Sequence, residues 1–217
     1  MSTVIDFHKV VAVAGDFPVL AGLDIEIAPG EIVHLRGSNG VGKTSFLRAC
    51  AGLIPIRAGE ANVLGFDMRV DRRAPRRYIG LLGHENHLYT DLWVREHLEF
   101  RASVVGASEG DVGAALRRVG LSERLWSVPI ERLSAGQRRR VAIASVLISR
   151  PQLWLLDEPH AALDSEGREF LDEILIDAAS SGATVVFASH ERDVLKSVAS
   201  REVTLRGGRL WEDSGAA

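Results

Sequence analysis

The stretch Gly37-Ser-Asn-Gly-Val-Gly-Lys43-Thr44 fits the pattern G-x-x-x-x-G-K-[S/T], and it decides the fold expected for this chain. The largely apolar run Ile32–Arg36 before it predicts a strand, and Lys43–Gly52 after it predicts a helix. Glycines let the intervening backbone curl, so that several N–H groups and the positive end of the helix face one anion. A loop of this kind binds nucleotide phosphates. The residues expected to contact them are Gly37, Ser38, Asn39, Gly40, Val41, Gly42, Lys43, Thr44 and Ser45.

A second motif lies far downstream, where the buried-strand pattern Leu153–Leu156 ends in Asp157-Glu158. Acids at the carboxyl end of a central strand lie where α/β sheets bind ligands. We expect Asp157 and the Thr44 hydroxyl to hold Mg²⁺, and Glu158 to polarise an attacking water. An exposed acidic turn would not explain why two acids end so apolar a run. The two motifs together predict a nucleotide hydrolase with ATP and Mg²⁺ as its ligands.

The rest of the chain alternates short β-branched runs with helical stretches, which predicts an α/β protein with a parallel sheet core. The first strands are closely spaced and suggest an added antiparallel sheet. Further strands are predicted at Val4–His8, Leu23–Ile27, Glu60–Leu64, Ile79–Leu82, Thr184–Ala188 and Glu202–Leu205. Further helices are predicted at Val94–Val105, Gly110–Val119, Ala135–Ser149, Glu166–Ser180 and Glu191–Ala199. We expect one domain over residues 1–217, with a helical subdomain inserted at about 93–150.

Composition excludes several classes of protein. The fractions of 46% hydrophobic and 25% charged residues are those of an ordinary soluble globular protein. The net charge of −3 offers no basic field for a nucleic acid. No apolar run approaches the ~20 residues that span a bilayer, and the first residues carry no signal-peptide core. The one cysteine, Cys50, suits a reducing compartment and is expected in the core. We therefore expect a cytoplasmic chain whose membrane span, if one is needed, comes from another protein.

The stretch Leu133-Ser-Ala-Gly-Gln137, followed by an amphipathic helix, identifies the family. Ser134 is a good N-cap, and small residues let backbone amides approach an anion. This LSAGQ stretch, shortly before an acid-terminated strand, resembles the signature sequence of the ABC ATPase family. The resemblance covers almost the whole chain, because Ala161–Asp164 matches the D-loop and His190 the switch histidine. It implies a P-loop ABC ATPase fold with an antiparallel β subdomain and a helical signature subdomain.

The resemblance also implies how such a chain works. Two copies pair head to tail, and ATP held by the phosphate loop of one is closed over by Ser134, Gly136 and Gln137 of the other, with Asp164 nearby. Glu158, His190 and His84 are implied to be catalytic. Hydrolysis would power transport through permease subunits in the membrane, gripped by the helical subdomain. The chain would then be a peripheral protein on the cytoplasmic face of the cell membrane.

Two departures from the family pattern stand out. Ala14 occupies the position where an aromatic ring usually stacks on adenine, and Phe17 either substitutes for it or has a core or edge role. His84 replaces the usual glutamine in the loop after Ile79–Leu82, and no chemical reason for the exchange is evident from the sequence. Gly83-His84, with the short single domain, resembles the ATP-binding subunit of the cytochrome c-type biogenesis haem exporter. Other exporters of drugs, lipids or small molecules remain the alternative, ahead of a soluble non-transport ABC ATPase.

Three further features are given ordinary roles. His84 and His87 without a third ligand make a poor metal site. His160 is predicted to be a surface neighbour of the active site, and the arginines between Arg69 and Arg77 are predicted to form a solvated face.

Overall fold

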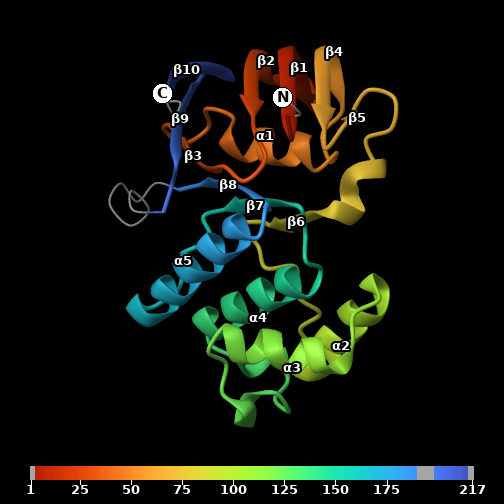
Figure 1. Cartoon of the computed structure of the whole chain (residues 1–217), viewed down its shortest axis with the longest axis vertical. Helices are drawn as coiled ribbons and strands as arrows, with labels where there is room; N and C mark the ends of the chain where they lie inside the picture. Colours follow the sequence, from red (N-terminus) through yellow and green to blue (C-terminus); the bar gives the residue numbers. More distant parts are fainter. Residues whose placement is uncertain (1–2, 190–197, 215–217) are drawn as a thin grey trace.

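A computed structural model describes residues 3–189 and 198–214, and its centre is a six-stranded sheet in the order β10-β9-β3-β8-β7-β6 (Figure 1). Five of these strands run parallel, and β10 is antiparallel to β9. The strands are β3 (Ile32–Arg36), β6 (Ile79–Leu82), β7 (Leu153–Asp157), β8 (Thr184–Ala188), β9 (Arg201–Arg206) and β10 (Arg209–Asp213). The predicted parallel core is confirmed.

A separate four-stranded antiparallel sheet, in the order β2-β1-β4-β5, is formed mainly by the N-terminal part of the chain. Its strands are β1 (Ile5–Ala14), β2 (Phe17–Ile27), β4 (Ile56–Val63) and β5 (Phe66–Asp67). Strand β1 is longer than predicted because Lys9 has a φ of 49° and shifts the register, which breaks the in–out alternation after His8. The expected antiparallel sheet is confirmed.

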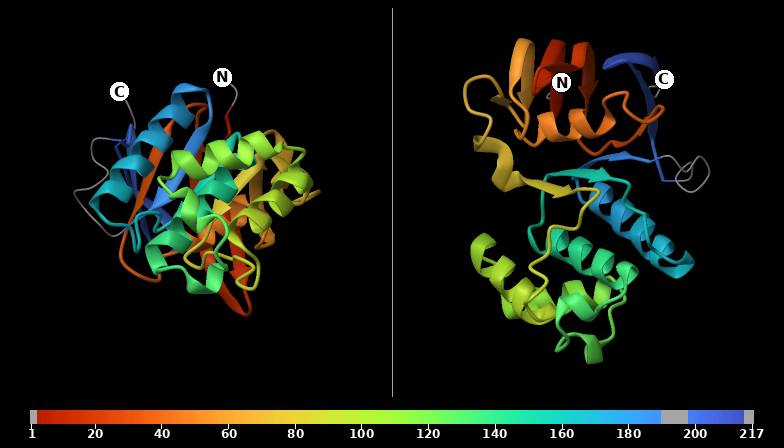
Figure 2. Two further views of the ribbon diagram at one scale, coloured as in Figure 1. Left: turned by 90° about the horizontal axis from the view of Figure 1, so that it is seen from below. Right: turned by 180° about the vertical axis from the view of Figure 1, so that it is seen from behind.

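Helix α1 (Lys43–Cys50) lies between the two sheets (Figures 1 and 2). It buries Phe46, Leu47 and Cys50 in a core shared by both sheets. Cys50 is completely buried, as predicted, and burial raises the pKa of its thiol. The phosphate loop that precedes α1 is therefore anchored to a rigid layer in the middle of the molecule.

The remaining helices form a second core with the opposite face of the parallel sheet. They are α2 (Val94–Val105), α3 (Glu109–Arg118), α4 (Ala135–Ile148) and α5 (Ser165–Ser180). Figure 1 shows α4 beneath the sheet, with α2 and α3 further from it. The division into one domain with a helical insert at about 93–150 stays a prediction.

Two short strands were not predicted, β5 and β10. Strand β10 follows the turn Gly207-Gly208, in which both residues have positive φ. The predicted helix Glu191–Ala199 lies almost entirely outside the described residues. Among the helices of residues 3–189 and 198–214, none is long and apolar enough to cross a membrane.

Candidate active site

The phosphate loop connects β3 to α1, and two of its glycines are required by its shape. Gly37 and Gly42 have φ values of 134° and 111°. A Cβ atom on Gly37 would lie 2.5 Å from the carbonyl oxygen of Leu205, and one on Gly42 would lie 2.8 Å from that of Val19. No other residue fits these positions without moving the backbone. The loop is thus packed between β9 and β2, which fixes the start of α1.

Lys43 begins α1, and its side chain folds back over the loop. Its Nζ donates hydrogen bonds to the carbonyl oxygens of Gly37 (2.7 Å) and Ser38 (3.1 Å). The residue is only 6% exposed. Burial lowers the pKa of the ammonium group, while the nearby carboxylates of Asp157 and Glu158 favour its charged form. A buried cation is therefore held at the centre of a loop suited to phosphate.

Thr44 and Asp157 meet at the inner edge of the same loop, as predicted. The Thr44 hydroxyl donates a hydrogen bond of 2.8 Å to Oδ2 of Asp157. A hydroxyl and a carboxylate are the hard oxygen donors that Mg²⁺ prefers, usually with bound water and substrate phosphates as its other ligands. This pair of side chains therefore fits a magnesium ion bound beside a nucleotide.

One cavity of about 400 Å³ is lined by residues from two of the predicted motifs, the phosphate loop and the acid pair at the end of β7. His84 lies in this cavity with the phosphate loop and the two acids. Arg48, on the last turn of α1, also reaches it, and the sequence had given no reason to select it. The lining residues are Asn39, Gly40, Gly42, Lys43, Thr44, Ser45, Arg48, His84, Asp157 and Glu158.

Glu158 follows β7 in a left-handed backbone conformation, with φ 48°. Such a conformation costs a non-glycine residue about 1–3 kcal/mol and persists only when the surroundings fix it. The Glu158 N–H donates to the carbonyl oxygen of Ala188 at 2.8 Å, which ties it to the end of β8. The strained backbone turns the chain away from the strand and places Glu158 at the cavity wall.

The prediction that His160 lies at the surface is wrong. His160 is 2% exposed, and its Nε2 is 2.8 Å from Oδ1 of Asp172 on α5. The turn after Pro159 runs inward against α5, so an imidazole there needs a buried partner. His160 anchors this turn.

The signature residues surround the N-terminus of α4, as predicted. The Ser134 hydroxyl accepts a hydrogen bond from the Gln137 N–H (3.2 Å), and the Gln137 side chain accepts one from the Ser134 N–H (2.9 Å). This capping box leaves the first turn well ordered. A Cβ atom on Gly136 would lie 2.8 Å from the carbonyl oxygen of Ala162, so only glycine lets the D-loop approach so closely.

The signature motif does not reach the phosphate loop of its own chain. Ser134, Gly136, Gln137 and Asp164 line a different cavity, of about 350 Å³. None of the residues that line it also lines the phosphate-loop cavity. Asp164 caps α5 by accepting a hydrogen bond of 2.9 Å from the Gly167 N–H. The two halves of the predicted site are therefore separate within one chain.

The structure does not test the predicted roles of two further residues, His190 and Phe17, in nucleotide binding or hydrolysis. His190 lies outside the described residues. Phe17 is 77% exposed at the start of β2, which excludes the core role for its ring. The prediction that it stacks on adenine stays open.

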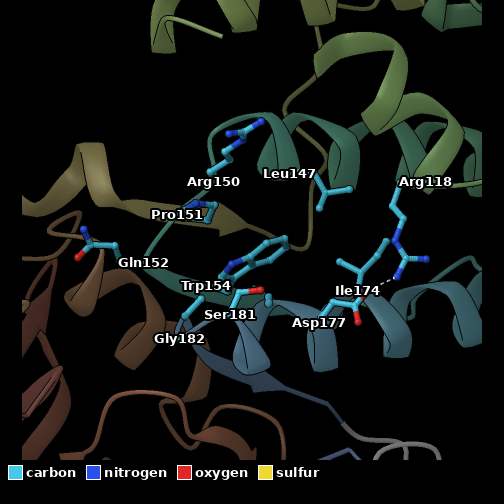
Figure 3. Close-up of a pocket in the computed structure, with 12 residues that line it drawn as sticks. Arg118, Leu147, Arg150, Pro151, Gln152, Trp154, Ile174, Asp177, Ser181 and Gly182 are labelled. Atoms are coloured by element: carbon cyan, nitrogen blue, oxygen red, sulfur yellow. Dashed lines mark hydrogen bonds and ion pairs between the residues drawn. The ribbon is translucent and has the colours of Figure 1, made fainter. Parts of the chain in front are cut away.

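A larger cavity, of about 460 Å³, lies between α3, the end of α4 and α5 (Figure 3). Trp154 lies in it, and Arg118 donates a hydrogen bond to Asp177 at 2.6 Å at one end. None of the predicted site residues lines this cavity. It is not part of the predicted nucleotide site.

Comparison with known proteins agrees with this geometry. A family model described as "ABC transporter" matches residues 20–161. The chain belongs to the ABC transporter family, and it is an ATP-binding component of the kind that hydrolyses ATP.

Two named relatives and one solved structure show which members of the family the chain resembles. The chain is 42% identical to "Cytochrome c biogenesis ATP-binding export protein CcmA" of Bordetella bronchiseptica, over 87% of this chain and 78% of that protein. It is 36% identical to "Glutamine transport ATP-binding protein GlnQ" of Escherichia coli strain K12, over 96% and 90%. A solved structure described as "Dimeric Structure of MJ0796, a Bacterial ABC Transporter Cassette" superposes with a TM-score of 0.88 and is 25% identical, covering 97% of this chain and 98% of that one.

Proposed function

We propose that this chain is the ATP-hydrolysing subunit of an exporter that acts in cytochrome c biogenesis, with haem as the transported molecule. The observation that carries this proposal is the 42% identity to a cytochrome c biogenesis export protein over most of both chains. His84, at the position where the wider family usually has glutamine, supports the same subfamily. The chain would act on the cytoplasmic face of the membrane, bound to permease subunits.

We also propose that two copies form the working unit. The phosphate loop and the signature motif line separate cavities of one chain, so each copy offers half of a nucleotide site. In a head-to-tail pair, the Ser134 end of α4 of one copy would face the phosphate loop of the other. The N-terminus of α4 would then add backbone N–H groups and a partial positive charge to the phosphates.

Within each site we assign separate tasks to the residues. Lys43 and the amides of the phosphate loop bind and orient the phosphates. Thr44 and Asp157 would hold Mg²⁺, which when bound neutralises charge on the phosphate oxygens. Glu158 accepts hydrogen bonds from the attacking water and orients it. His84 and His190 are assigned to the polar wall around that water.

Exposed aromatic side chains next to the His84 loop support docking to a membrane subunit. Tyr89, Trp93 and Phe100 are 57%, 51% and 51% exposed. The rings of Tyr89 and Phe100 meet edge to face with their centres 5.8 Å apart. Clustered exposed aromatics of this kind mark interaction surfaces. The patch is continuous in sequence with the loop that carries His84, so a partner bound there would be linked to the nucleotide site.

The identity of the transported molecule can be tested in the source organism. Deleting the gene should abolish covalently bound haem in c-type cytochromes, measured by haem staining of membrane proteins, because export for their assembly loses its motor. Wild-type chain supplied in trans should restore the stain. Glu158→Gln and Trp93→Asp should not restore it, although purified Trp93→Asp should keep its ATPase activity.

The match to a glutamine transport protein favours a second candidate, an ATPase of amino-acid transport. Normal c-type cytochromes in the deletion strain, together with impaired glutamine uptake, would replace the first proposal with this one. Unchanged b-type cytochromes serve as the control, because their haem is not attached covalently and a general loss of haem would reduce them too.

The role of His84 is tested by two substitutions at one position. His84→Ala should lower kcat by roughly 10- to 100-fold, because a polar group beside the attacking water is lost. His84→Gln should stay within about threefold of wild type, because an amide also donates and accepts hydrogen bonds. Steady-state turnover with saturating ATP measures both. Equal activity of His84→Ala and wild type would remove His84 from the mechanism.

A further inference from the structure

Arg139 lies one turn into α4, and it is the largest fully buried side chain among the described residues, with 2% exposure. A guanidinium has five N–H groups, and here each of them donates to a different oxygen atom. The acceptors are the carbonyl oxygens of Gly83 (2.8 Å), Asp157 (3.0 Å), Glu158 (2.7 Å) and Pro159 (3.2 Å) and the side-chain oxygen of Asn86 (3.0 Å). Arg139 is thus fully satisfied by two separate segments of the chain.

Each of these segments carries a residue of the proposed site. Gly83 and Asn86 bracket His84, and the other segment contains Glu158 itself. Arg139 in turn belongs to the helix that begins with the signature residues. A single side chain therefore connects the N-terminal turns of α4 with both walls of the phosphate cavity.

The charge of Arg139 is unusual for a purely structural link. Four of its five hydrogen-bond acceptors are backbone carbonyls, and the fifth is the side-chain oxygen of Asn86. Burial lowers the pKa of its guanidinium to about 10, although the charges of Asp157 and Glu158 favour the charged form. It stays protonated at neutral pH. Removing a guanidinium cation from water costs free energy, and hydrogen bonds to neutral acceptors offset only part of that cost.

We propose that Arg139 is a positioning residue for ATP hydrolysis, which holds the backbone of Glu158 and the His84 loop in fixed relation to the signature end of α4. The strained φ of Glu158 needs support from its surroundings. Arg139 supplies it, because the Glu158 carbonyl oxygen accepts the shortest of the five hydrogen bonds. A movement of α4 caused by nucleotide at its N-terminus would be transmitted to both walls at once. The proposal rests on the proposed roles of Glu158 and His84 in hydrolysis.

Three variants grade the loss of these contacts. Arg139→Met removes all five hydrogen bonds, Arg139→Lys keeps the charge but not the planar fork, and Asn86→Ala removes only the side-chain acceptor. Arg118→Met is the matched control, because Arg118 is a half-exposed arginine bonded to Glu173 and Asp177 on α5. For each folded variant, kcat, KM and ATP affinity are measured together with thermal unfolding.

The expected result is a fall in kcat at nearly constant KM. Arg139→Met should lose roughly 100-fold, the penalty typical of a displaced catalytic group. Arg139→Lys should lie between it and wild type, Asn86→Ala should lose about threefold to tenfold by the same misplacement, and Arg118→Met should match wild type. If Arg139→Met does not fold, Arg139→Lys and Asn86→Ala decide the matter. Unchanged kcat per folded molecule in both would overturn the proposal, even if their melting temperatures fell.

Hydrogen exchange separates this proposal from the assignment of function. Backbone amides in residues 83–89 and 157–163 should exchange faster in Arg139→Lys than in wild type, whether or not the chain is turning over ATP. Unchanged exchange in both segments would contradict the positioning role. A wild-type chain that fails to hydrolyse ATP would instead contradict the proposed function.

Discussion

ATP binding should fall by roughly 100-fold or more when Lys43 is replaced by alanine, because two charge-assisted hydrogen bonds are worth about 3 kcal/mol or more together. Lys43 is 6% exposed and its ammonium group already lies against the loop, so little ordering is needed for it to meet a phosphate. Equilibrium binding of MgATP, by calorimetry or with a fluorescent analogue, measures the loss. Wild-type affinity in Lys43→Ala would remove this residue from the phosphate site.

The matched control is Lys9→Ala. Lys9 is an exposed lysine on β1, and its removal changes the net charge by the same amount. Its affinity for ATP should equal that of wild type. A similar loss in both variants would mean that net charge, rather than the position of Lys43, determines the affinity.

ATP turnover should fall by roughly 10²–10⁴-fold in Glu158→Gln, the range that a positioned general base contributes. The amide keeps the shape of the side chain, so ATP should still bind. Since the product state is then reached only slowly, the ATP-bound pair should accumulate. Light scattering with MgATP should show a dimer for the variant and mostly monomer for wild type.

Glu173→Gln provides the control for Glu158→Gln. Glu173 is an exposed carboxylate that pairs with Arg118 at 3.1 Å, and it does not line the phosphate cavity. Its turnover and oligomeric state should match wild type. Normal turnover in Glu158→Gln would transfer the catalytic role to another residue, with His190 the first candidate.

The regular parts of the fold could be predicted because local pattern and burial agree there. Strands β3, β6 and β8 begin and end at the predicted residues, since each is a short apolar run buried on both faces. The predicted range of β1 ended too early, because a positive φ at Lys9 has no signature in a single sequence. The turn Gly207-Gly208 did offer a hairpin signal for β10, and it was missed.

The site was predictable where residue type alone implies chemistry, as for Lys43, Thr44 and Asp157. Arg139 and His160 were missed because a buried polar residue is decided by tertiary partners that lie 12 to 56 positions away in the sequence. The sequence offers only a weak signal for Arg139. It lies three, four and seven positions before the buried residues Ala142, Ile143 and Val146, on the face that α4 turns to the core. Arg138 and Arg140 also lie three and four positions before buried residues of α4, so helical spacing alone does not single out Arg139.

The completely buried thiol of Cys50 can report how often the layer around α1 opens. The chain contains no other cysteine, and α1 is covered by a sheet on each side. Burial suppresses the thiolate, so an alkylating reagent can react only during moments when this layer separates. The rate at which Cys50 is alkylated therefore measures how frequently the layer opens. Because α1 starts at the phosphate loop, a bound nucleotide that stabilises the layer would lower the rate of Cys50 alkylation.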